Sequence, residues 1–257
     1  MAATGIQVDK RMLSNVGSLE VNMEGADKVV YMTHDYFSMS SCKNNTLVAT
    51  AKTAKKLGVG NVVAVCPVEH DMAHSDDAQS WIEKRQEAEQ QALSAHGKMS
   101  ILNSDLVYGP DATHLVHYMH QCAMAGKIKA SFLSDDAKFK PVHSGDLANA
   151  VAKAMDTGRA GQFAVRGSEE VSIRQLLNLV EGSCGVEQGK TGGRFEMPIL
   201  PLTRMLEEFL VGMAADTNMA EMLAYFAENQ KVSPVTGQCF FDATGMTQEG
   251  NLREFFK

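Results

Sequence analysis

Short apolar strands alternate with amphipathic helices along this chain of 257 residues, and no other feature limits the fold as strongly. KVVYMT (residues 28–33) and NVVAVCPV (residues 61–68) are apolar on both faces, as strands buried between two layers of helices must be. Residues 43–58 carry apolar side chains at helical spacing and end at Gly58, a typical helix stop. Strand–helix alternation of this kind predicts a mostly parallel sheet with helices on both faces, a doubly wound α/β domain.

The alternation continues through the middle of the chain. We expect further helices at residues 80–93, with Asp76 or Asp77 as N-cap, and at residues 112–126, 144–158 and 173–182. Further strands are expected at residues 99–110 and 162–167. Ser172 and Gln175 have the spacing of a capping box, which predicts that a helix begins there.

The pattern changes after Pro198 to a long helical tract, residues 201–229, and an irregular tail. We therefore predict two parts: a Rossmann-like domain at residues 1–185 and a helical C-terminal part at residues 186–257.

The composition excludes several classes of function. The net charge of −7 argues against a nucleic-acid surface, which needs clustered lysine and arginine. No run of 18 apolar residues occurs, so no membrane span is predicted. The 5 cysteines are scattered, odd in number and without a CxxC pair, which favours reduced thiols over disulfides or a zinc site.

Several stretches, in their order and spacing, resemble the extended short-chain dehydrogenase family. The resemblance runs from Ala26 to Val180. Its segments are GADKVVYMT (25–33, like the family's fourth strand), TAKKLGVGNVVAVCPV (53–68, like the next helix and fifth strand), DLVYGP (105–110), KPVHSGDLANAVAKAM (140–155) and GQFAVRGSEEVSIRQLLNLV (161–180). Towards the C-terminus, residues 197–210 and 228–256 resemble atypical members of the family that are accessory subunits in the peripheral arm of mitochondrial respiratory complex I.

The resemblance implies catalytic positions that this chain fills with other residues. Active members use a tyrosine with a lysine one helical turn later, so that the ammonium lowers the pKa of the phenol, and a serine at the end of the preceding strand. Aligned by Glu89, these positions hold Trp81, Arg85 and Cys66. An indole N–H cannot transfer a proton near neutral pH, and arginine differs from lysine in reach and geometry. We expect vestigial positions, an inert helix, and Trp81 free to act in packing.

The resemblance also implies a glycine-rich loop that holds the pyrophosphate of a dinucleotide, and no GxGxxG or GxxGxxG occurs here. The glycines at 58–60 and 158–161 precede strands, and those at 191–193 follow nothing strand-like. The first 25 residues have room for one or two short strands, at 4–8 and 18–22, where an intact member has two or three strand–helix units. We expect a truncated dinucleotide half that binds no cofactor alone. NADPH is expected only if another chain supplies the glycine-rich half.

Two groups of polar side chains could be read as metal sites. His114, His117 and His120 recur at every third position of an expected helix. The loop after the second strand contains Glu69, His70, Asp71, His74, Asp76 and Asp77. These residues could have a metal-binding or acid–base role. Alternatively, the histidines form a solvated helix face and the loop is rich in capping residues. We favour the second interpretation, so no metal is predicted. His143 and Asp146 are interpreted as turn and N-cap residues.

Together these expectations predict a non-catalytic, structural accessory subunit of complex I on the matrix side of the mitochondrial inner membrane. Its partners would be other subunits, including a chain packed on Val29–Met32, because loss of the family's first three strands makes that strand an apolar sheet edge. Two alternatives stay open: a stand-alone nucleotide-sensing regulatory protein, and an active NAD(P)-dependent epimerase or reductase with non-standard residues.

Overall fold

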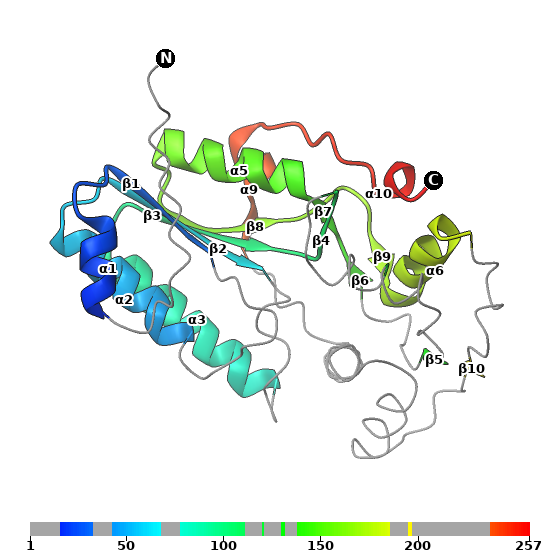
Figure 1. The fold of residues 1–257 in the computed structure, drawn as a ribbon, viewed down its shortest axis with the longest axis horizontal. Coiled ribbons are helices and arrows are strands. Elements are labelled where there is room, and N and C mark those ends of the chain that lie inside the picture. Colours follow the sequence, from blue (N-terminus) through cyan, green and yellow to red (C-terminus); the bar gives the residue numbers. More distant parts are fainter. Residues whose placement is uncertain are drawn as a thin grey trace.

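A parallel five-stranded sheet forms the centre of the molecule (Figure 1). The computed structural model describes residues 16–32, 43–67, 78–110, 120, 130–131, 138–185, 195–196 and 237–257. The strand order is β1–β2–β3–β8–β11, and every neighbouring pair is parallel. The strands are β1 (Lys28–Met32), β2 (Asn61–Pro67), β3 (Met99–Ser104), β8 (Gly161–Val165) and β11 (Gln238–Cys239).

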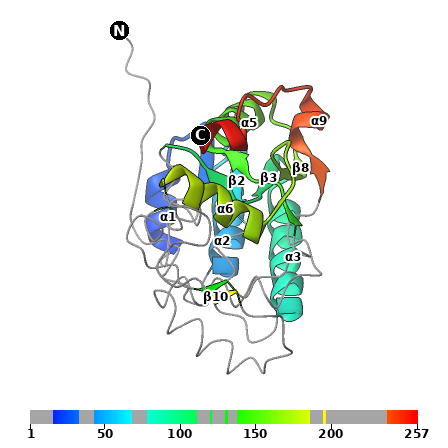
Figure 2. The ribbon, with the colours of Figure 1, turned by 90° about the vertical axis from the view of Figure 1, so that its right-hand side faces the viewer.

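Helices cover both faces of this sheet (Figure 2). One layer contains α1 (Val16–Met23), α2 (Lys43–Lys56) and α3 (Ala78–Ala95). The other contains α5 (Ser144–Thr157), which contacts β2 and β3, and α9 (Phe240–Thr244), which contacts β8 and β11. The predicted fold class, a Rossmann-like parallel sheet with helices on both faces, is confirmed.

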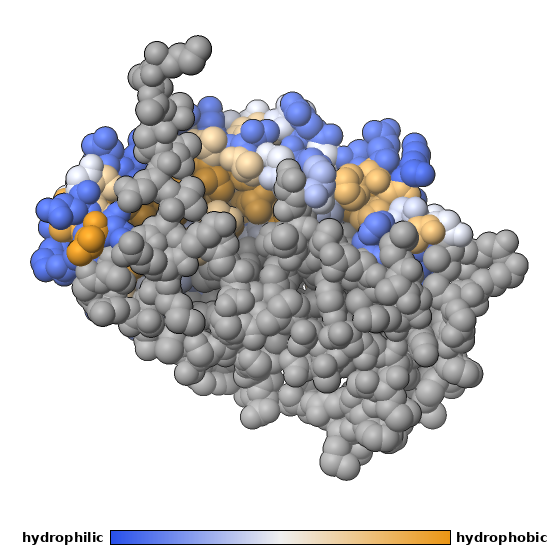
Figure 3. Space-filling model, viewed as in Figure 1, coloured by the Kyte–Doolittle hydropathy of each residue, from blue (hydrophilic) through white to orange (hydrophobic). Residues whose placement is uncertain are grey.

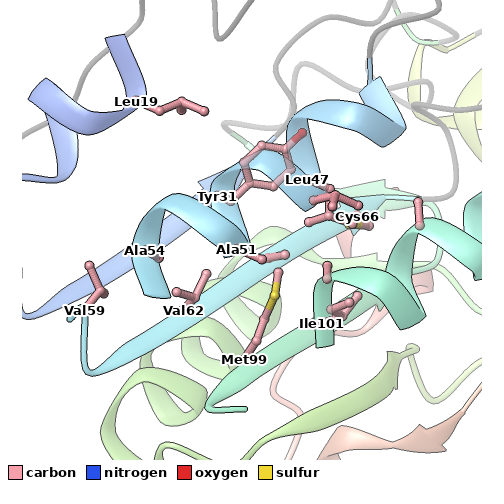
Figure 4. Close-up of a cluster of buried hydrophobic side chains, with 14 of the residues drawn as sticks. Leu19, Tyr31, Leu47, Ala51, Ala54, Val59, Val62, Cys66, Met99 and Ile101 are labelled. Carbon is pink, nitrogen blue, oxygen red and sulfur yellow. The ribbon is translucent and has the colours of Figure 1, made fainter. Parts of the chain in front are cut away.

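The central strands are buried on both sides because each successive side chain of a strand points to the opposite face. In β2, Val62 and Ala64 enter the cluster beneath α1, α2 and α3, whereas Val63 and Val65 enter the cluster beneath α5. All four side chains are fully buried. Figure 4 shows the first of these clusters, in which Ala51 and Ala54 bring α2 close to the strands.

Several predicted elements are confirmed. The helix expected at residues 43–58 is α2, and Gly58 follows it with a φ of 72°, a conformation that favours glycine. The helix expected at 80–93 is α3. The expected capping box is present at the start of α6 (Ile173–Ser183), where Ser172 and Gln175 exchange hydrogen bonds.

The expectation that residues 28–33 are buried on both faces is wrong for β1. Tyr31 is buried and its hydroxyl lies 2.8 Å from Oγ1 of Thr46 on α2, but Val30 and Met32 are each 41% exposed. The reason is position: β1 is the end strand of the sheet in the described residues, and α5 contacts β2 and β3, further in. Apolar surface gathers along the sheet beneath the polar outer side of α5 (Figure 3).

Residues 99–110 do not form one strand, as expected, but two. The main-sheet strand β3 ends at Ser104, and β4 (Val107–Tyr108) pairs with β7 (Val142–His143) in a separate two-stranded sheet. The turn between them is held by Asp105, whose carboxylate accepts hydrogen bonds from the backbone N–H groups of Leu106 and Lys140. Two more small sheets pair β6 (Lys138–Phe139) with β9 (Val171–Ser172), and β5 (Ala130–Ser131) with β10 (Phe195–Glu196).

The two ends of the chain also differ from expectation. Residues 18–22, expected as a short strand, belong to helix α1. The expected irregular tail contains β11, which pairs with β8, then α9 and α10 (Leu252–Phe255). Phe240 and Phe241 of α9 enter the cluster beneath α5, so the last part of the chain shares the core of the α/β domain. The boundary after residue 185 stays a prediction.

Some expectations fall outside the described residues: the strand at 4–8, the N-caps Asp76 and Asp77, and the helical tract at 201–229. The same is true of the helix at 112–126 except for His120, which is helical. Within the described ranges, no helix is both long and apolar enough to cross a membrane.

Candidate functional site

A ligand site is expected at the carboxyl ends of the parallel strands, because ligands of open α/β sheets bind in the crevice outside these ends. In register, Pro67 of β2, Ser104 of β3 and Val165 of β8 mark this edge. Two residues separate β4 from the end of β3; β4 pairs with β7, and α5 begins directly after β7.

Cys66, where the resemblance implies a serine, lies near the end of β2 and pairs in register with Asn103 of β3. Its side chain is buried in the apolar cluster beneath α2 and α3, near Leu47 (Figure 4). Reactive cysteines need exposure and a positive environment, and the described neighbours of Cys66 are apolar side chains that bury it.

Trp81 and Arg85 both lie in the first half of α3, so the expected i, i+4 spacing on one helix is present. Their side chains lie outside the described part of the chain. The roles assigned to these two positions stay predictions.

Glu89, one turn further along α3, is buried at 1% exposure and joins the helix to two strands. Its Oε2 accepts a hydrogen bond of 3.3 Å from the amide of Asn103 on β3 and one of 2.5 Å from the amide of Gln162 on β8. A buried carboxylate is stable only with such donors. The sequence marked Glu89 by its spacing but did not reveal that it fixes the helix against the sheet.

A second polar group surrounds the turn after β3. Asp105 is buried, with both carboxylate oxygens engaged by backbone N–H groups at 2.7 and 2.9 Å. Burial raises the pKa of this carboxyl, and the two backbone hydrogen bonds oppose the rise. Both oxygens therefore take part in holding the turn.

Tyr108 is the phenol at this edge that sequence reasoning missed. Its buried ring makes an edge-to-face contact with His143, the ring centroids 5.3 Å apart. Burial, and then the negative charges of Asp146 and Glu169, raise the pKa of Tyr108 to about 12. A phenol that abstracts protons near neutral pH needs the opposite shift, so the direction of this shift does not favour such a role for Tyr108.

His143 and Asp146 have the structural roles predicted for them. His143 is the N-cap of α5, and its Nδ1 accepts a hydrogen bond of 3.2 Å from the N–H of Gly145. Asp146 is buried in the first turn of that helix and accepts hydrogen bonds from the backbone of residues 249 and 250.

The glycines at 58–60 and 158–161 do not lie where a pyrophosphate-binding loop would. The glycines at 58–60 lie before β2 and those at 158–161 lead into β8, at the amino ends of the strands, as the sequence pattern indicates. The connections after β1 and β2, residues 33–42 and 68–77, contain no glycine. Close backbone approach to a pyrophosphate needs glycine in such a connection.

No group of three or more metal-ligating side chains occurs among the residues with a described position. His114, His117 and the loop at residues 69–77 lie outside them, and His120 is described only singly. The metal readings of these groups are therefore untested.

No known family model matches the sequence, and no curated protein matches it either. Solved structures do share its fold. They include an NADPH-dependent quinone oxidoreductase from Escherichia coli in complex with NADPH, with 14% identity, a TM-score of 0.66, and coverage of 99% of this chain and 84% of that one. A triphenylmethane reductase from Citrobacter sp. has 12% identity, a TM-score of 0.66, and coverage of 98% and 83%.

A nucleoside-diphosphate-sugar epimerase from Staphylococcus aureus has 12% identity and a TM-score of 0.64, with coverage of 95% of this chain and 81% of that one. At such low identity these similarities establish the fold alone. The chain has the Rossmann-like α/β fold that this oxidoreductase, this reductase and this epimerase share.

We predict that Glu89→Gln lowers the free energy of unfolding by about 1–3 kcal/mol. The new side chain has one acceptor oxygen in place of two, and its NH₂ group would be a buried donor facing the donors of Asn103 and Gln162. The matched control is Glu87→Gln on the exposed side of the same helix, expected to change it by less than about 0.5 kcal/mol. Urea unfolding of both variants measures the difference. Equal stabilities would show that the Glu89 carboxylate does not fix α3 to the sheet.

We predict that Tyr108 weakens the fold in strong alkali. Its pKa in the folded chain, about 12, exceeds the ordinary value of 10.0. The stabilisation is therefore complete below pH 10 and is lost as the pH rises from 10 to 12. Between these values the free energy of unfolding should fall more steeply for the wild type than for Tyr108→Phe. If the free energy of unfolding fell equally with pH in the wild type and in Tyr108→Phe, the pKa of Tyr108 would not be raised.

Proposed function

We propose that this chain is a non-catalytic protein built on the short-chain dehydrogenase fold and that it serves as a structural subunit of a larger assembly. The assembly proposed is mitochondrial respiratory complex I, with the chain on the matrix side of the inner membrane. The observation that carries the proposal is the end strand β1, where Val30 and Met32 leave apolar surface exposed and whose outer edge has no neighbouring strand among the described residues. Such edges favour pairing with another chain.

The chemistry at the carboxyl edge supports the absence of turnover. Cys66 is buried among apolar side chains, the pKa of Tyr108 is raised, and both oxygens of Asp105 are engaged by backbone. Trp81 and Arg85 stand where the resemblance implies a tyrosine and a lysine. Tyr108 is the one phenol among these residues, and its pKa is shifted away from the range that proton abstraction near neutral pH needs.

The resemblance of residues 197–210 and 228–256 to accessory subunits supports complex I as the assembly. NADPH bound jointly with a chain that supplies a glycine-rich loop is compatible with this proposal. An active NAD(P)-dependent reductase or epimerase is the second candidate, because the solved structures that share the fold include such enzymes, one of them in complex with NADPH.

We predict that the purified chain transfers no hydride from NADPH to quinones and does not epimerise sugar nucleotides. The triple variant Cys66→Ser, Trp81→Tyr, Arg85→Lys should be equally inactive, because the loops after β1 and β2 contain no glycine to hold the pyrophosphate. NADPH absorbance and product chromatography measure both activities. Hydride transfer by the wild-type chain would decide for the second candidate.

We predict that the chain migrates with the large respiratory complex on native gels of mitochondrial membranes. Val30→Lys combined with Met32→Lys should remove it from that band, because the charges disfavour both burial and strand pairing at β1. The control is Val21→Lys on α1, where the native side chain is already 70% exposed. Migration of the wild type as a free monomer, or equal incorporation of both variants, would contradict the proposal.

A further inference from the structure

The last twelve residues, 246–257, run back from α9 along α5 to the carboxyl edge of the sheet (Figures 1 and 2). We call this segment the C-terminal strap. It begins after Gly245, whose φ of 66° ends α9, and it contains the short helix α10. Unlike β11 before it, the strap pairs with no strand in the described part of the chain.

Asp146 of α5 holds the middle of the strap. Its Oδ1 accepts a hydrogen bond of 3.0 Å from the N–H of Glu249, and its Oδ2 accepts one of 2.9 Å from the N–H of Gly250. The carboxylate is 4% exposed, and hydrogen bonds to a buried charged acceptor are stronger than those between neutral groups. Both oxygens are thus committed to the strap.

The strap must approach α5 closely at Gly250. A Cβ at this position would lie 2.2 Å from Cβ of His143 and 2.9 Å from Oδ2 of Asp146. Glycine is therefore required for the two backbone N–H groups to reach the carboxylate.

The remaining attachments are made by single side chains. The amide of Gln248 donates to the carbonyl of Arg166 at 2.7 Å, and Nε of Arg253 donates to the Glu169 carboxylate at 2.8 Å on the exposed surface. The rings of Phe255 and Phe256 lie against Tyr108, with centroids 5.5 and 6.5 Å away. Leu252 and Phe256 are buried, so the strap has two apolar anchors of its own. Helix α9 before it has Phe240 and Phe241 and also follows a strand paired with the sheet.

We propose that the C-terminal strap is a lid that Asp146 latches shut and that opens as a unit while the five-stranded sheet stays folded. The strap pairs with no described strand, and the hydrogen bonds that join it to α5 and to residues 166–169 each involve a side chain. Segments outside the strand ladder can open locally while the sheet stays folded. Opening would uncover Tyr108 and His143 at the carboxyl edge, where α/β proteins bind their ligands. This device is independent of the function proposed above, since it requires neither catalysis nor a partner chain.

The test is amide hydrogen exchange of the full chain, resolved by peptide mass spectrometry. In the wild type, peptides within 246–257 should exchange through openings that leave β2 and β3 protected. Asp146→Asn turns one acceptor into a donor that faces a backbone N–H, so exchange in the strap should rise at least about tenfold with β2 and β3 unchanged. The matched control is Asp156→Asn on the same helix, where the side chain is 79% exposed and should leave the strap unaffected.

Three results would overturn the proposal: strap and sheet that exchange together in the wild type, an unchanged strap in Asp146→Asn, or equal loss of protection in strap and sheet. Arg253→Gln keeps the question decidable if Asp146→Asn does not fold. It removes only the exposed contact with Glu169 and should raise exchange in the strap two- to threefold, by roughly the small contribution of a surface ion pair. The proposal would also be wrong if exchange in the strap did not rise in Arg253→Gln and if strap and sheet exchanged together in the wild type.

Discussion

Burial of β2 and β3 on both faces is the constraint on which the other elements depend. Every described side chain of these strands is buried, so each strand needs a helix layer on either side and a neighbouring strand along either edge. Helices α2 and α3 supply one layer and α5 the other. Glu89 adds a polar connection within this apolar arrangement, and its two amide partners come from adjacent strands.

The features that the sequence predicted are those with a local cause. The apolar run of β2, the stop at Gly58 and the capping box of Ser172 and Gln175 all depend on residues within a few positions of one another. The features it did not predict depend on distant partners. Val107 and Tyr108 form a strand outside the main sheet because β7 pairs with them, and the short strand β11 exists only because β8 pairs with it.

The candidate site shows the same division. The spacing of Trp81, Arg85 and Glu89 placed them on one helix, and the cap role of His143 followed from its position before α5. Tyr108 escaped notice because its environment is assembled from α5, from the loop that holds Glu169 and from the C-terminal residues Phe255 and Phe256. A sequence pattern indicates where a phenol lies along the chain, but the charges that shift its pKa come from elsewhere in the fold.

The pairing of β11 with β8 has a consequence for how the protein is made. Synthesis proceeds from the N-terminus, so β1, β2, β3 and β8 all leave the ribosome before residues 238–239. Until then the outer edge of β8 lacks its strand, and the cluster beneath α5 lacks Phe240 and Phe241. The nascent sheet is therefore open along β8 for as long as some seventy further residues are being translated, several seconds at about 5–20 residues per second. During that interval the growing chain presents two strand edges without a described neighbour, that of β8 as well as that of β1.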